Sequence, residues 1–463
     1  MSLLSQIGYS GVRATQVALT ATGQNVANVN TPGFSRLGVE MGSLSGHTAL
    51  SSGRGVQVNN IRRIADDFVN RQLWRATSHE SFTESQQKYV SALETLMASE
   101  GSNISGGLDN FYAALSEATS TPDSIALRQQ ILNEARNLAQ RVNSLSNNIE
   151  TQLNGLRGQR EAIIVELNGL TDNLATLNKR ITHVEASNGD AKALRDQRDK
   201  LVQDLAELAD VRVMEAADGS FNVSLANGQP LVAGPTAATV KLTTLANNHQ
   251  DFSLDFAGTP FPMARDGWGG QLGGLYEAEY NGLRSTQKTI SDIAGEIAAL
   301  FNGVLADGNA YDLDGDSGLA LELFTHTPGS ISQVLKVNDL EPKDLAFSSA
   351  ADEPGNNDKL RDLLALKNQK VTLTIGGVSS SVTLNDAYAT LLGGIASQSR
   401  QGQADVETAA SVLKQAQAQR DSISAVNLDE EGVNLMNYQQ AYQANLKVIT
   451  TAGALFDSVL GMF

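Results

Sequence analysis

The acidic run Asp312–Asp316 is the segment whose residue types come nearest to a metal site. A calcium loop of the EF-hand kind needs oxygen ligands at its first, third and fifth positions, a glycine at the sixth and a bidentate glutamate at the twelfth. Counted from Asp312, the sixth residue is Ser317 and the twelfth is Leu323. The glycine is misplaced and the acid is missing, so the sequence predicts a tight acidic turn and no metal site.

Catalytic motifs are also incomplete. His79-Glu80 begins like the helical motif of zinc proteases, but Thr83 occupies the place of the second histidine. The glycines between 267 and 274 match no phosphate-binding loop, because no Gly-Lys-Ser or Gly-Lys-Thr follows them. The chain has no cysteine, and no serine, histidine and acid are grouped as a nucleophile site requires. We therefore expect no enzyme, and no catalytic, cofactor-binding or metal-binding residues.

A dense run of opposite charges lies at Leu194–Leu201, with the order Leu-Arg-Asp-Gln-Arg-Asp-Lys-Leu. Opposite charges three and four residues apart stabilise an exposed helix face. We expect this run to be such a face rather than a binding site.

Bulk composition limits the classes of partner. The 463 residues carry a formal net charge of −17, and the sequence pI is about 4.7. A nucleic-acid partner needs a basic surface, so we expect none. Met1–Ile7 lacks the basic segment of a secretory signal peptide, and no apolar run approaches the ~18 residues of a membrane-spanning helix. We expect no membrane insertion.

The first element is a predicted helix from about Leu4 to Asn28, with two apolar rows ~140° apart around its axis. The rows are Ile7, Ala14 and Ala21, and Val12, Leu19 and Val26. A helix that is apolar on more than one face is usually surrounded by others, so this helix either lies in the core of its own domain or is buried only on assembly. The segment Asn30-Thr31-Pro32-Gly33 ends the helix, because proline disfavours the α region before it and glycine turns the chain.

A coiled-coil-like helix is predicted from about Ser124 to Ala186, which at 1.5 Å per residue would be ~90 Å long. Its regular row is Ala135, Val142, Ile149, Leu156, Ile163, Leu170, Leu177 and Val184. A second row is Leu138, Leu145, Leu153, Leu167, Leu174 and Ile181. A helix of this length is too long to fit within a compact globular domain.

Strand-like alternation follows over 211–262, broken by Asp218-Gly219 and Asn227-Gly228, which is typical of a β-meander. We expect a glycine hinge at 267–274 and mixed structure over 331–383 with strands near 334–337 and 371–384. The remaining predicted elements are a strand near 56–61 and helices at about 65–99, 108–118, 194–208, 275–305 and 385–423.

The last segment, from Asn427, is heptadic to its end. Its first row is Leu435, Tyr442, Ile449, Phe456 and Phe463, and its second row is Tyr438, Ala452 and Val459 with Asn445 between them. Termini normally fray unless they are tied down. We interpret both ends as assembly interfaces that are disordered in the free protein and fold when neighbours are present.

These patterns predict an α+β fold of about three domains. A long α-helical coiled-coil bundle is built from both chain termini and the central helices, with an inserted β-rich outer domain. The predicted domains are a terminal coiled-coil region (1–60 with 424–463), a helical bundle domain (61–210 with 275–325 and 385–423) and the β-rich outer domain (211–274 with 326–384).

Two segments at opposite ends resemble the signatures of the flagellar axial proteins, the family of the rod, hook and hook–filament junction. They are Ala27-Asn28-Val29-Asn30-Thr31-Pro32-Gly33-Phe34-Ser35, and Asn427-Leu428-Asp429-Glu430-Glu431 followed by Asn434-Leu435 and Tyr438–Ala444. Segments 194–199, 218–223, 227–232, 273–275, 312–315 and 420–424 narrow the resemblance to the hook-associated protein 1 family.

This resemblance implies a structural subunit of the bacterial flagellum that connects the hook to the filament. It implies export by the flagellar type III apparatus and an extracellular location at the distal hook end. The implied partners are other copies of itself in a ring, the flagellar hook protein, the second hook–filament junction protein, and an export chaperone on the C-terminal helix. Asn28, Asn30, Thr31, Pro32, Gly33 and Phe34 would belong to the assembly interface.

Three alternatives remain at this point. A hook or distal-rod axial protein would share the end signatures but lack the heptads of 135–184. A cytoplasmic coiled-coil scaffold would explain the heptads but not the paired signatures. An enzyme with a catalytic outer domain would need an acid–base, nucleophile or metal grouping within 211–383, and the sequence offers none.

Overall fold

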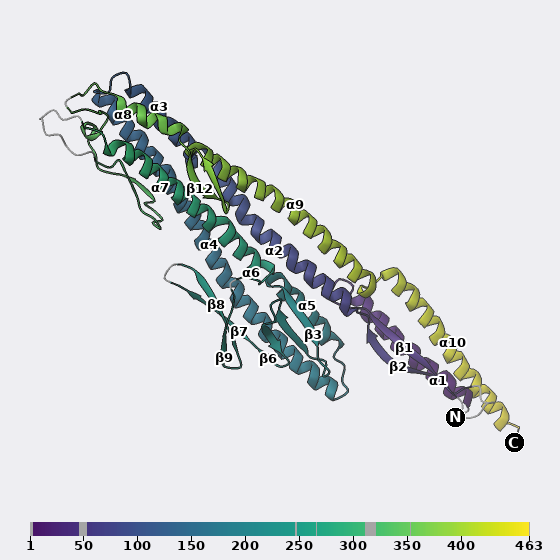
Figure 1. Cartoon of the computed structure of the whole chain (residues 1–463). Coiled ribbons are helices and arrows are strands. Elements are labelled where there is room, and N and C mark those ends of the chain that lie inside the picture. The colour runs from purple at the N-terminus through teal and green to yellow at the C-terminus, as the bar shows by residue number, and fades with distance from the viewer. Residues whose placement is uncertain are drawn as a thin grey trace. The chain divides into compact units, whose positions relative to one another are not determined.

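A computed structural model describes residues 3–45, 53–245, 248–264, 266–310, 321–351 and 353–462. The fold is α+β, as predicted, with long helices and several small antiparallel sheets (Figure 1). The acidic run Asp312–Asp316 and the terminal Phe463 lie outside the described residues.

The helices of the described part agree closely with the predicted ranges. They are α1 (Leu3–Ala27), α2 (Asp67–Ala98), α3 (Ile104–Ala118), α4 (Ile125–Ala186), α5 (Lys192–Leu208), α6 (Gly270–Glu277), α7 (Ser285–Ala306), α8 (Asp358–Ala365), α9 (Leu384–Ser424) and α10 (Leu428–Leu460). Between α6 and α7, Ala278–Arg284 is π-helical. Short 3-10 segments are Glu100–Ser102, Pro342–Asp344 and Leu366–Asn368.

The strands form small sheets whose hydrogen-bonded neighbours are all antiparallel. Two-stranded sheets are β1 (Leu37–Leu44) with β2 (Gly55–Arg63), β10 (Phe324–His326) with β11 (Leu335–Val337), and β12 (Val371–Ile375) with β13 (Val378–Val382). A four-stranded sheet has the order β3 (Val211–Glu215), β4 (Phe221–Leu225), β5 (Pro230–Ala233) and β6 (Thr236–Ala237). A three-stranded sheet has the order β7 (Thr239–Thr244), β8 (Gln250–Phe256) and β9 (Thr259–Pro262).

The chain divides into two compact units. Unit 1 consists of Met1–Glu80, Ile164–Gly270 and Ala409–Phe463, and unit 2 of Ser81–Ile163 and Gln271–Thr408. The borders fall inside α2, α4 and α9 and directly after Gly270, the first residue of α6, and the two β-rich segments of the sequence lie in different units. The domain borders expected from the sequence therefore differ from this division, and they stay a prediction about the assembled protein.

The core of unit 1 combines helix and sheet residues. Leu167, Leu174 and Ile181, from the second predicted row of α4, are fully buried. The ring of Trp74 meets that of Phe221 edge to face, with 6.4 Å between the ring centroids. The alternation of β4 buries Phe221, Val223 and Leu225 and turns the residues between them outward, as a one-sided sheet requires.

The core of unit 2 contains an aromatic cluster. Phe111 on α3 meets Phe301 on α7 at 5.1 Å and Phe324 on β10 at 5.9 Å between ring centroids. Leu138, Leu145 and Leu153 of α4 are fully buried in the same unit. Edge-to-face aromatic pairs add to the burial of apolar area, so this cluster fixes the short β10–β11 hairpin on the helices.

Five asparagines on helices hold strand residues by both of the strand's backbone groups. In each case the side-chain Nδ2 donates to the strand carbonyl and the strand N–H donates to Oδ1, at 2.7–3.1 Å. The pairs are Asn25–Leu37, Asn143–Leu335, Asn168–Val240, Asn178–Phe221 and Asn302–Phe324. The side chain thus satisfies backbone groups that another strand would otherwise have to pair.

Two sequence expectations need correction, and one stays a prediction. The border between the two units follows Gly270, where α6 begins, so the hinge expected at 267–274 stays a prediction; at Gly269 (φ +59°) a Cβ would lie 2.3 Å from the Cβ of Asp210. The single strand expected near 56–61 is one half of a hairpin with β1. The mixed segment 331–383 also contains α8, whose eight residues are too short for a clear periodicity.

The helical segment Gly270–Ala306 is long and apolar enough to cross a membrane by length and composition alone. Ile290, Ile293 and Ile297 are fully buried within unit 2. The π-helical segment carries a fully buried carboxylate, Glu279, which pairs with Arg160 at 2.6 Å. Core helices pass the same test of length and composition, and these contacts are those of a core helix.

Candidate assembly interface

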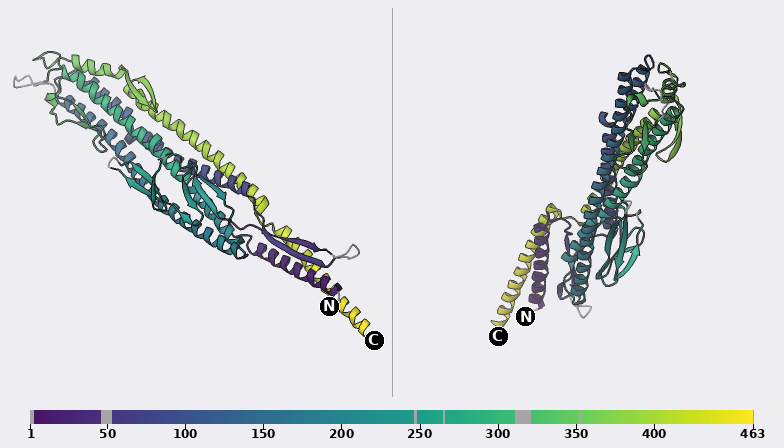
Figure 2. Two further views of the ribbon diagram at one scale, coloured as in Figure 1. Left: turned by 60° about the horizontal axis from the view of Figure 1, so that its bottom comes forward. Right: turned by 90° about the vertical axis from the view of Figure 1, so that its left-hand side faces the viewer.

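Helices α1 and α10 of unit 1 lie side by side and antiparallel (Figures 1 and 2). Their seam repeats at alternating three- and four-residue intervals, which is the spacing of a coiled coil. On α1 the seam consists of Gly8, Gly11, Thr15, Ala18, Thr22 and Asn25, all buried. On α10 it consists of Glu431, Asn434, Tyr438, Ala441, Asn445, Val448 and Ala452, buried or half-buried.

Glycine on the α1 seam permits the close approach of the two helices. A Cβ at Gly11 would lie 2.4 Å from the Oδ1 of Asn445, and a Cβ at Gly8 would lie 2.8 Å from the Cγ1 of Ile449. Asn445 is itself held by a hydrogen bond from its Nδ2 to the Ala441 carbonyl at 2.9 Å. Larger residues at either glycine would force the helices apart.

Asn25 joins the two ends of the chain. Its Nδ2 donates to the Oε1 of Glu431 at 3.0 Å and to the Leu37 carbonyl at 3.0 Å, while its Oδ1 accepts from the Leu37 N–H at 2.8 Å. Asn25 and Glu431 are both buried, and Glu431 belongs to the C-terminal signature. One asparagine therefore ties α1, β1 and α10 together, a role that no spacing rule in the sequence indicates.

The predicted helix stop is confirmed, since α1 ends at Ala27 and a turn follows. The Thr31 N–H donates to the Asn28 carbonyl at 2.9 Å, and the Phe34 N–H donates to the Thr31 carbonyl at 3.2 Å. Gly33 has φ +80°, which other residues rarely adopt. Asn30, Thr31 and Pro32 are exposed, whereas Asn28, Gly33 and Phe34 are half-buried.

The segment after this turn is tethered to α9 and α10. The Arg36 N–H donates to the Ser424 carbonyl at 2.8 Å, and the Arg36 guanidinium pairs with Glu430 at 2.9 Å. The guanidinium of Arg420 donates to the Phe34 carbonyl at 3.3 Å. Residues within or directly beside the two end signatures thus contact each other within unit 1.

The charge run of α5 is buried in part, which corrects the expectation of an exposed helix face. Asp196 accepts from the Ser35 N–H at 3.3 Å, and the guanidinium of Arg63 bridges Asp196 and Asp199. Burial raises the pKa of both carboxyl groups above their ordinary range, although Arg63 opposes that shift. These contacts connect β2 and the turn to α5.

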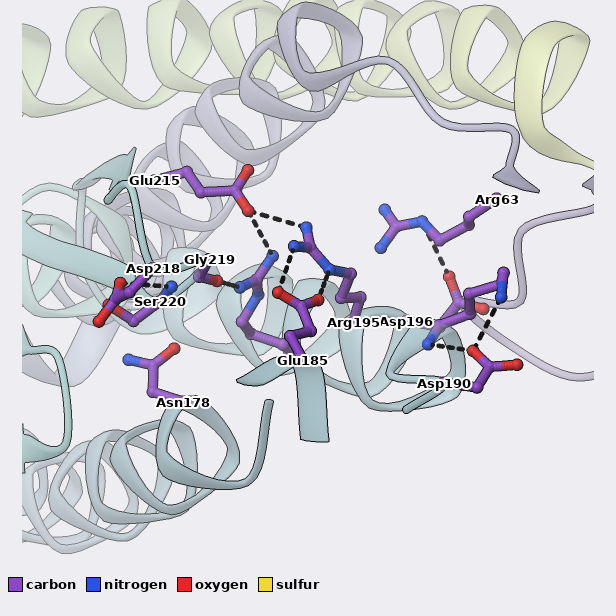
Figure 3. Close-up of polar contacts among 12 residues, drawn as sticks. Arg63, Asn178, Glu185, Asp190, Arg195, Asp196, Glu215, Asp218, Gly219 and Ser220 are labelled. Atoms are coloured by element: carbon purple, nitrogen blue, oxygen red, sulfur yellow. Dashed lines mark hydrogen bonds and ion pairs between the residues drawn. The ribbon is translucent and has the colours of Figure 1, made fainter. Parts of the chain in front are cut away.

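Arginines 195 and 198 of the same run fasten α5 to its sheet. Arg195 lies between Glu185 and Glu215, with an N–O distance of 2.8 Å to each (Figure 3). Arg198 is 1% exposed, stacks on the Phe221 ring at 3.2 Å from the centroid and donates to the Gly219 carbonyl. Burial lowers the pKa of Arg198 to about 10. The partners of these arginines lie up to 23 residues away along the chain, so a local pattern could not reveal the burial.

The two predicted rows of α1 flank the seam rather than form it. On one flank, Val12, Leu19 and Val26 stand beside the first predicted row of α10, because an antiparallel pair brings the same heptad positions together. We name this surface the apolar flank, and it consists of Val12, Leu19, Val26, Leu435, Tyr442, Ile449 and Phe456. Of the second predicted row of α10, Tyr438 and Ala452 lie on the seam, and Val459 continues it.

The opposite flank is covered by the chain's own hairpin. Ala14 and Ala21 are buried there and Ile7 is half-buried. The Val56 N–H of β2 donates to the Oγ of Ser10 at 3.0 Å, so the hairpin packs on this side of α1. The facing positions of α10 are small or polar: Asn437, Ala444, Thr451 and Ser458. Of the two flanks, the apolar flank is therefore the one with exposed large apolar side chains, which are Val26, Leu435 and Phe456.

Exposed large apolar side chains gather on these two helices. Of 25 such residues in the described chain, 14 lie on α1, on α10 or at Met462 just beyond it. Val26 is 38% exposed, Leu435 40% and Phe456 56%. Scattered apolar residues on a surface need no explanation, but a contiguous exposed patch marks an interaction site.

Two surface grooves lie beside the predicted turn. One, of about 850 Å³, is lined by Asn28, Pro32 and Phe34 together with residues of α4 and α5. The other, of about 620 Å³, is lined by Val29, Arg36 and the start of α10. Both are open, and their position places the turn at the surface of unit 1.

Among the described residues, no group of three or more His, Asp and Glu could hold a metal ion. The Oγ of Ser291 lies 3.1 Å from the Nε2 of His326, a pair that the sequence does not reveal. No carboxylate hydrogen-bonds to His326 in the described part of unit 2, so the orienting acid of a nucleophile site is not provided there.

Comparison with known families identifies the protein family to which the chain belongs. Residues 90–322, half of the 463-residue chain, match the family described as the flagellar hook-associated protein FlgK helical domain. The chain belongs to the FlgK family of flagellar hook-associated proteins. Residues 417–462, which include all of α10, match the C-terminal family of the flagellar basal body rod FlgEFG proteins. Helix α10, which carries nine of the 25 exposed large apolar side chains of the described chain, therefore lies in a segment that is shared more widely than the FlgK family.

Individual relatives span the whole chain. Flagellar hook-associated protein 1 of Salmonella typhimurium is 26% identical over 563 residues, covering 100% of both chains. The protein of the same name from Escherichia coli is 25% identical over 556 residues, again covering 100% of both. That of Bacillus subtilis is 26% identical and covers 96% of this chain and 95% of its own. Since the first two alignments exceed 463 positions, those FlgK relatives carry segments without a counterpart here.

The fold agrees with a solved FlgK structure. The flagellar hook junction protein FlgK from Burkholderia pseudomallei superposes with a TM-score of 0.67 at 15% identity, over 76% of this chain and 100% of that one. At this identity the likeness concerns the fold alone. It supports the α+β architecture predicted from the heptads and the β-meander.

Proposed function

We propose that this chain forms the junction that connects the flagellar hook to the filament, and that it assembles there through the α1/α10 pair. The chain is a FlgK-family structural component of the flagellum, and the curated relatives it matches end to end are hook-associated proteins. The observation that carries the assembly mode is the exposed apolar flank, which the chain's own hairpin leaves uncovered.

The surface of the pair suits contact with further copies in a ring. A closed ring needs contacts in which one face of a subunit meets a different face of the next. Fully burying a Leu or Phe side chain stabilises by about 1.5–3 kcal/mol, and half-exposed ones contribute about half of that. Several such side chains per subunit would therefore stabilise a contact between copies by about 1 kcal/mol each.

Further partners follow from the place of the protein between two structures. The hook protein would lie on one side and the second hook–filament junction protein on the other. An export chaperone would cover the apolar surface of α10 until assembly. The subunit would leave the cell through the flagellar type III apparatus and act outside it, with its ends disordered until neighbours arrive. Association with flagellar components is common to the family, and these particular partners are our proposal.

A structural role without catalysis fits the described residues. The buried charged side chains of Arg63, Asp196 and Arg198 all make contacts within the chain, and the described residues contain no cluster of His, Asp and Glu that could hold a metal ion. A hook or distal-rod protein remains the alternative. The match of residues 90–322 to the helical domain of FlgK favours the junction.

Deletion of residues 435–463 tests the proposal in cells that lack the native gene. We expect normal hooks, no stable filament and flagellin lost to the medium. A matched control removes part of an exposed strand of unit 2, such as β13, and should leave filaments in place. Full motility of cells with the terminal deletion would overturn the proposed function.

A further inference from the structure

The seam of α10 is longer than the helix that fills it. Gly8 packs against Asn445, Val448 and Ile449, so the described start of α1 at Leu3 lies near Ala452. Beyond Ala452 the three- and four-residue spacing continues through Leu455, Val459 and Met462. These side chains are 57%, 54% and 81% exposed. We call residues 453–462 the overhang.

The overhang has the side chains of a coiled-coil core. Besides its three seam positions, it carries Phe456 at 56% and Leu460 at 58% exposed. No helix of the described chain covers it, and Figures 1 and 2 both show α10 running on past the start of α1. A heptad row with no partner in its own chain calls for a helix surface in another molecule.

The apolar flank offers such a surface. It is the groove side of a two-helix pair, bounded by Val12 and Leu19 on α1 and by Tyr442 and Ile449 on α10, which are half-buried. A third helix that packs into the groove between two helices completes a three-helix coiled coil. The overhang and the apolar flank are different faces of one molecule, so their contact joins copies head to tail.

Charge supports the pairing of these two surfaces. The only charged side chain of α1 is Arg13, next to Val12, and the only one of the overhang is Asp457, next to Phe456. Each copy carries a net charge of −17, so copies repel except where their contact surfaces are nearly neutral or complementary. A surface with one arginine facing a surface with one aspartate meets that condition.

We infer that the overhang of one copy docks on the apolar flank of the next copy, with Arg13 and Asp457 forming an ion pair across the contact. The inference rests on the proposed function, because it takes other copies as the partner. It adds which surface meets which, and it makes the contact heterologous rather than symmetric.

Engineered cysteines test the contact directly, because the chain contains no cysteine of its own. In a Leu19→Cys, Val459→Cys variant the two positions cannot meet within one chain. Gly11 lies opposite Asn445, so Leu19 lies level with Asn437, and Val459 is about 33 Å further along α10 at 1.5 Å per residue. Oxidation of assembled hook ends should give a ladder of cross-linked dimers and larger species. The control Ala444→Cys, Val459→Cys places one cysteine on the opposite flank and should give none.

A charge exchange provides a second, independent measurement. Arg13→Asp should reduce filament number severalfold, and adding Asp457→Arg should restore it. No ladder for the first cysteine pair, or an equal ladder for the control, would overturn the docking. So would a failure of the double charge variant to improve on Arg13→Asp. If the contact fails these tests while removal of 435–463 still abolishes filaments, the proposed function stands and only the docking is wrong.

Discussion

Asn178 offers the sharpest test of how the helices hold the sheets. Its side chain is fully buried and donates to the Phe221 and Gly234 carbonyls, both at 2.8 Å, while accepting from the Phe221 N–H at 2.9 Å. The substitution Asn178→Leu keeps the number of heavy atoms and the branching at Cγ and leaves no cavity, so the main loss is that of these hydrogen bonds.

The expected loss can be worked out from these contacts. A net intramolecular hydrogen bond contributes about 1 kcal/mol, and each buried polar group left without a partner costs about 1–3 kcal/mol. Three hydrogen bonds disappear, and their backbone partners stay buried. We therefore expect the free energy of unfolding of unit 1 to fall by about 3–5 kcal/mol.

The chain supplies its own reporter for this unfolding. Its two tryptophans, Trp74 and Trp268, both lie in unit 1, and Trp74 contacts the ring of Phe221, the residue that Asn178 holds. Denaturant titration followed by tryptophan fluorescence should show the midpoint falling for Asn178→Leu. The control Asn173→Leu, at an exposed position of the same helix, should leave it unchanged. A fall of less than about 1 kcal/mol would refute the reasoning.

Three further predictions concern other contacts. Gly11→Leu should abolish filament assembly because its side chain would strike Asn445, whereas Gly23→Leu, with no atom within 4 Å of its Cβ position, should assemble normally in electron micrographs. Arg198→Met should lower the free energy of unfolding of unit 1 by about 2–4 kcal/mol, because the variant lacks the cation–π contact with Phe221 and the charge-assisted hydrogen bond to Gly219. The control Arg212→Met, at an exposed position of β3, should have no effect in the same fluorescence titration. Burial lowers the pKa of His326, so folded unit 2 favours the neutral form of this side chain. Its contribution to stability is complete above the ordinary pKa of about 6.5 and is lost as the pH falls through the lowered pKa. Calorimetry between pH 7.5 and about 5 should therefore show a lower melting temperature of unit 2 in acid, and His326→Gln should reduce this difference.

Much of the helical architecture could be predicted from periodicity. The rows of α4 predicted a helix from 124 to 186, and it runs from Ile125 to Ala186. The second, less regular row proved the more deeply buried, since all six of its residues are fully buried whereas Leu170 and Val184 of the regular row are half-buried. Apolar repeats indicate which face of a helix is buried, but how completely each residue is buried depends on the neighbouring elements that cover it.

The seam of the terminal pair escaped prediction because its residues are small. Gly8, Gly11 and Thr15 carry no apolar signal, so the search for large side chains found the flanks on either side. Close packing of two helices selects small residues at the contact, and only the partner's position shows where that contact lies. The pairing of the two chain ends was predicted, while the face of each helix that meets its partner was not.

Polar contacts between distant residues were the hardest to anticipate. Asp196, Arg198 and Asp199 are spaced as on an exposed helix, yet their partners are Ser35, Arg63 and Phe221, contributed by other segments. The helix-borne asparagines likewise depend on a strand being beside them. In the π-helical segment, Glu279 pairs with Arg284 five residues on, a spacing that an α-helix does not bring together and that sequence rules do not seek.

The central claim, that the α1/α10 pair joins hook to filament through its apolar flank, is tested most directly by electron microscopy of flagella from cells expressing a flank variant. The variant carries Leu435→Ser, Ile449→Ser and Phe456→Ser, and the matched control carries Asn437→Ala, Thr451→Ala and Ser458→Ala on the opposite flank of the same helix. We expect bare hooks without filaments for the flank variant and full-length filaments for the control. Filaments of normal number and length on the hooks of the flank variant would contradict the account.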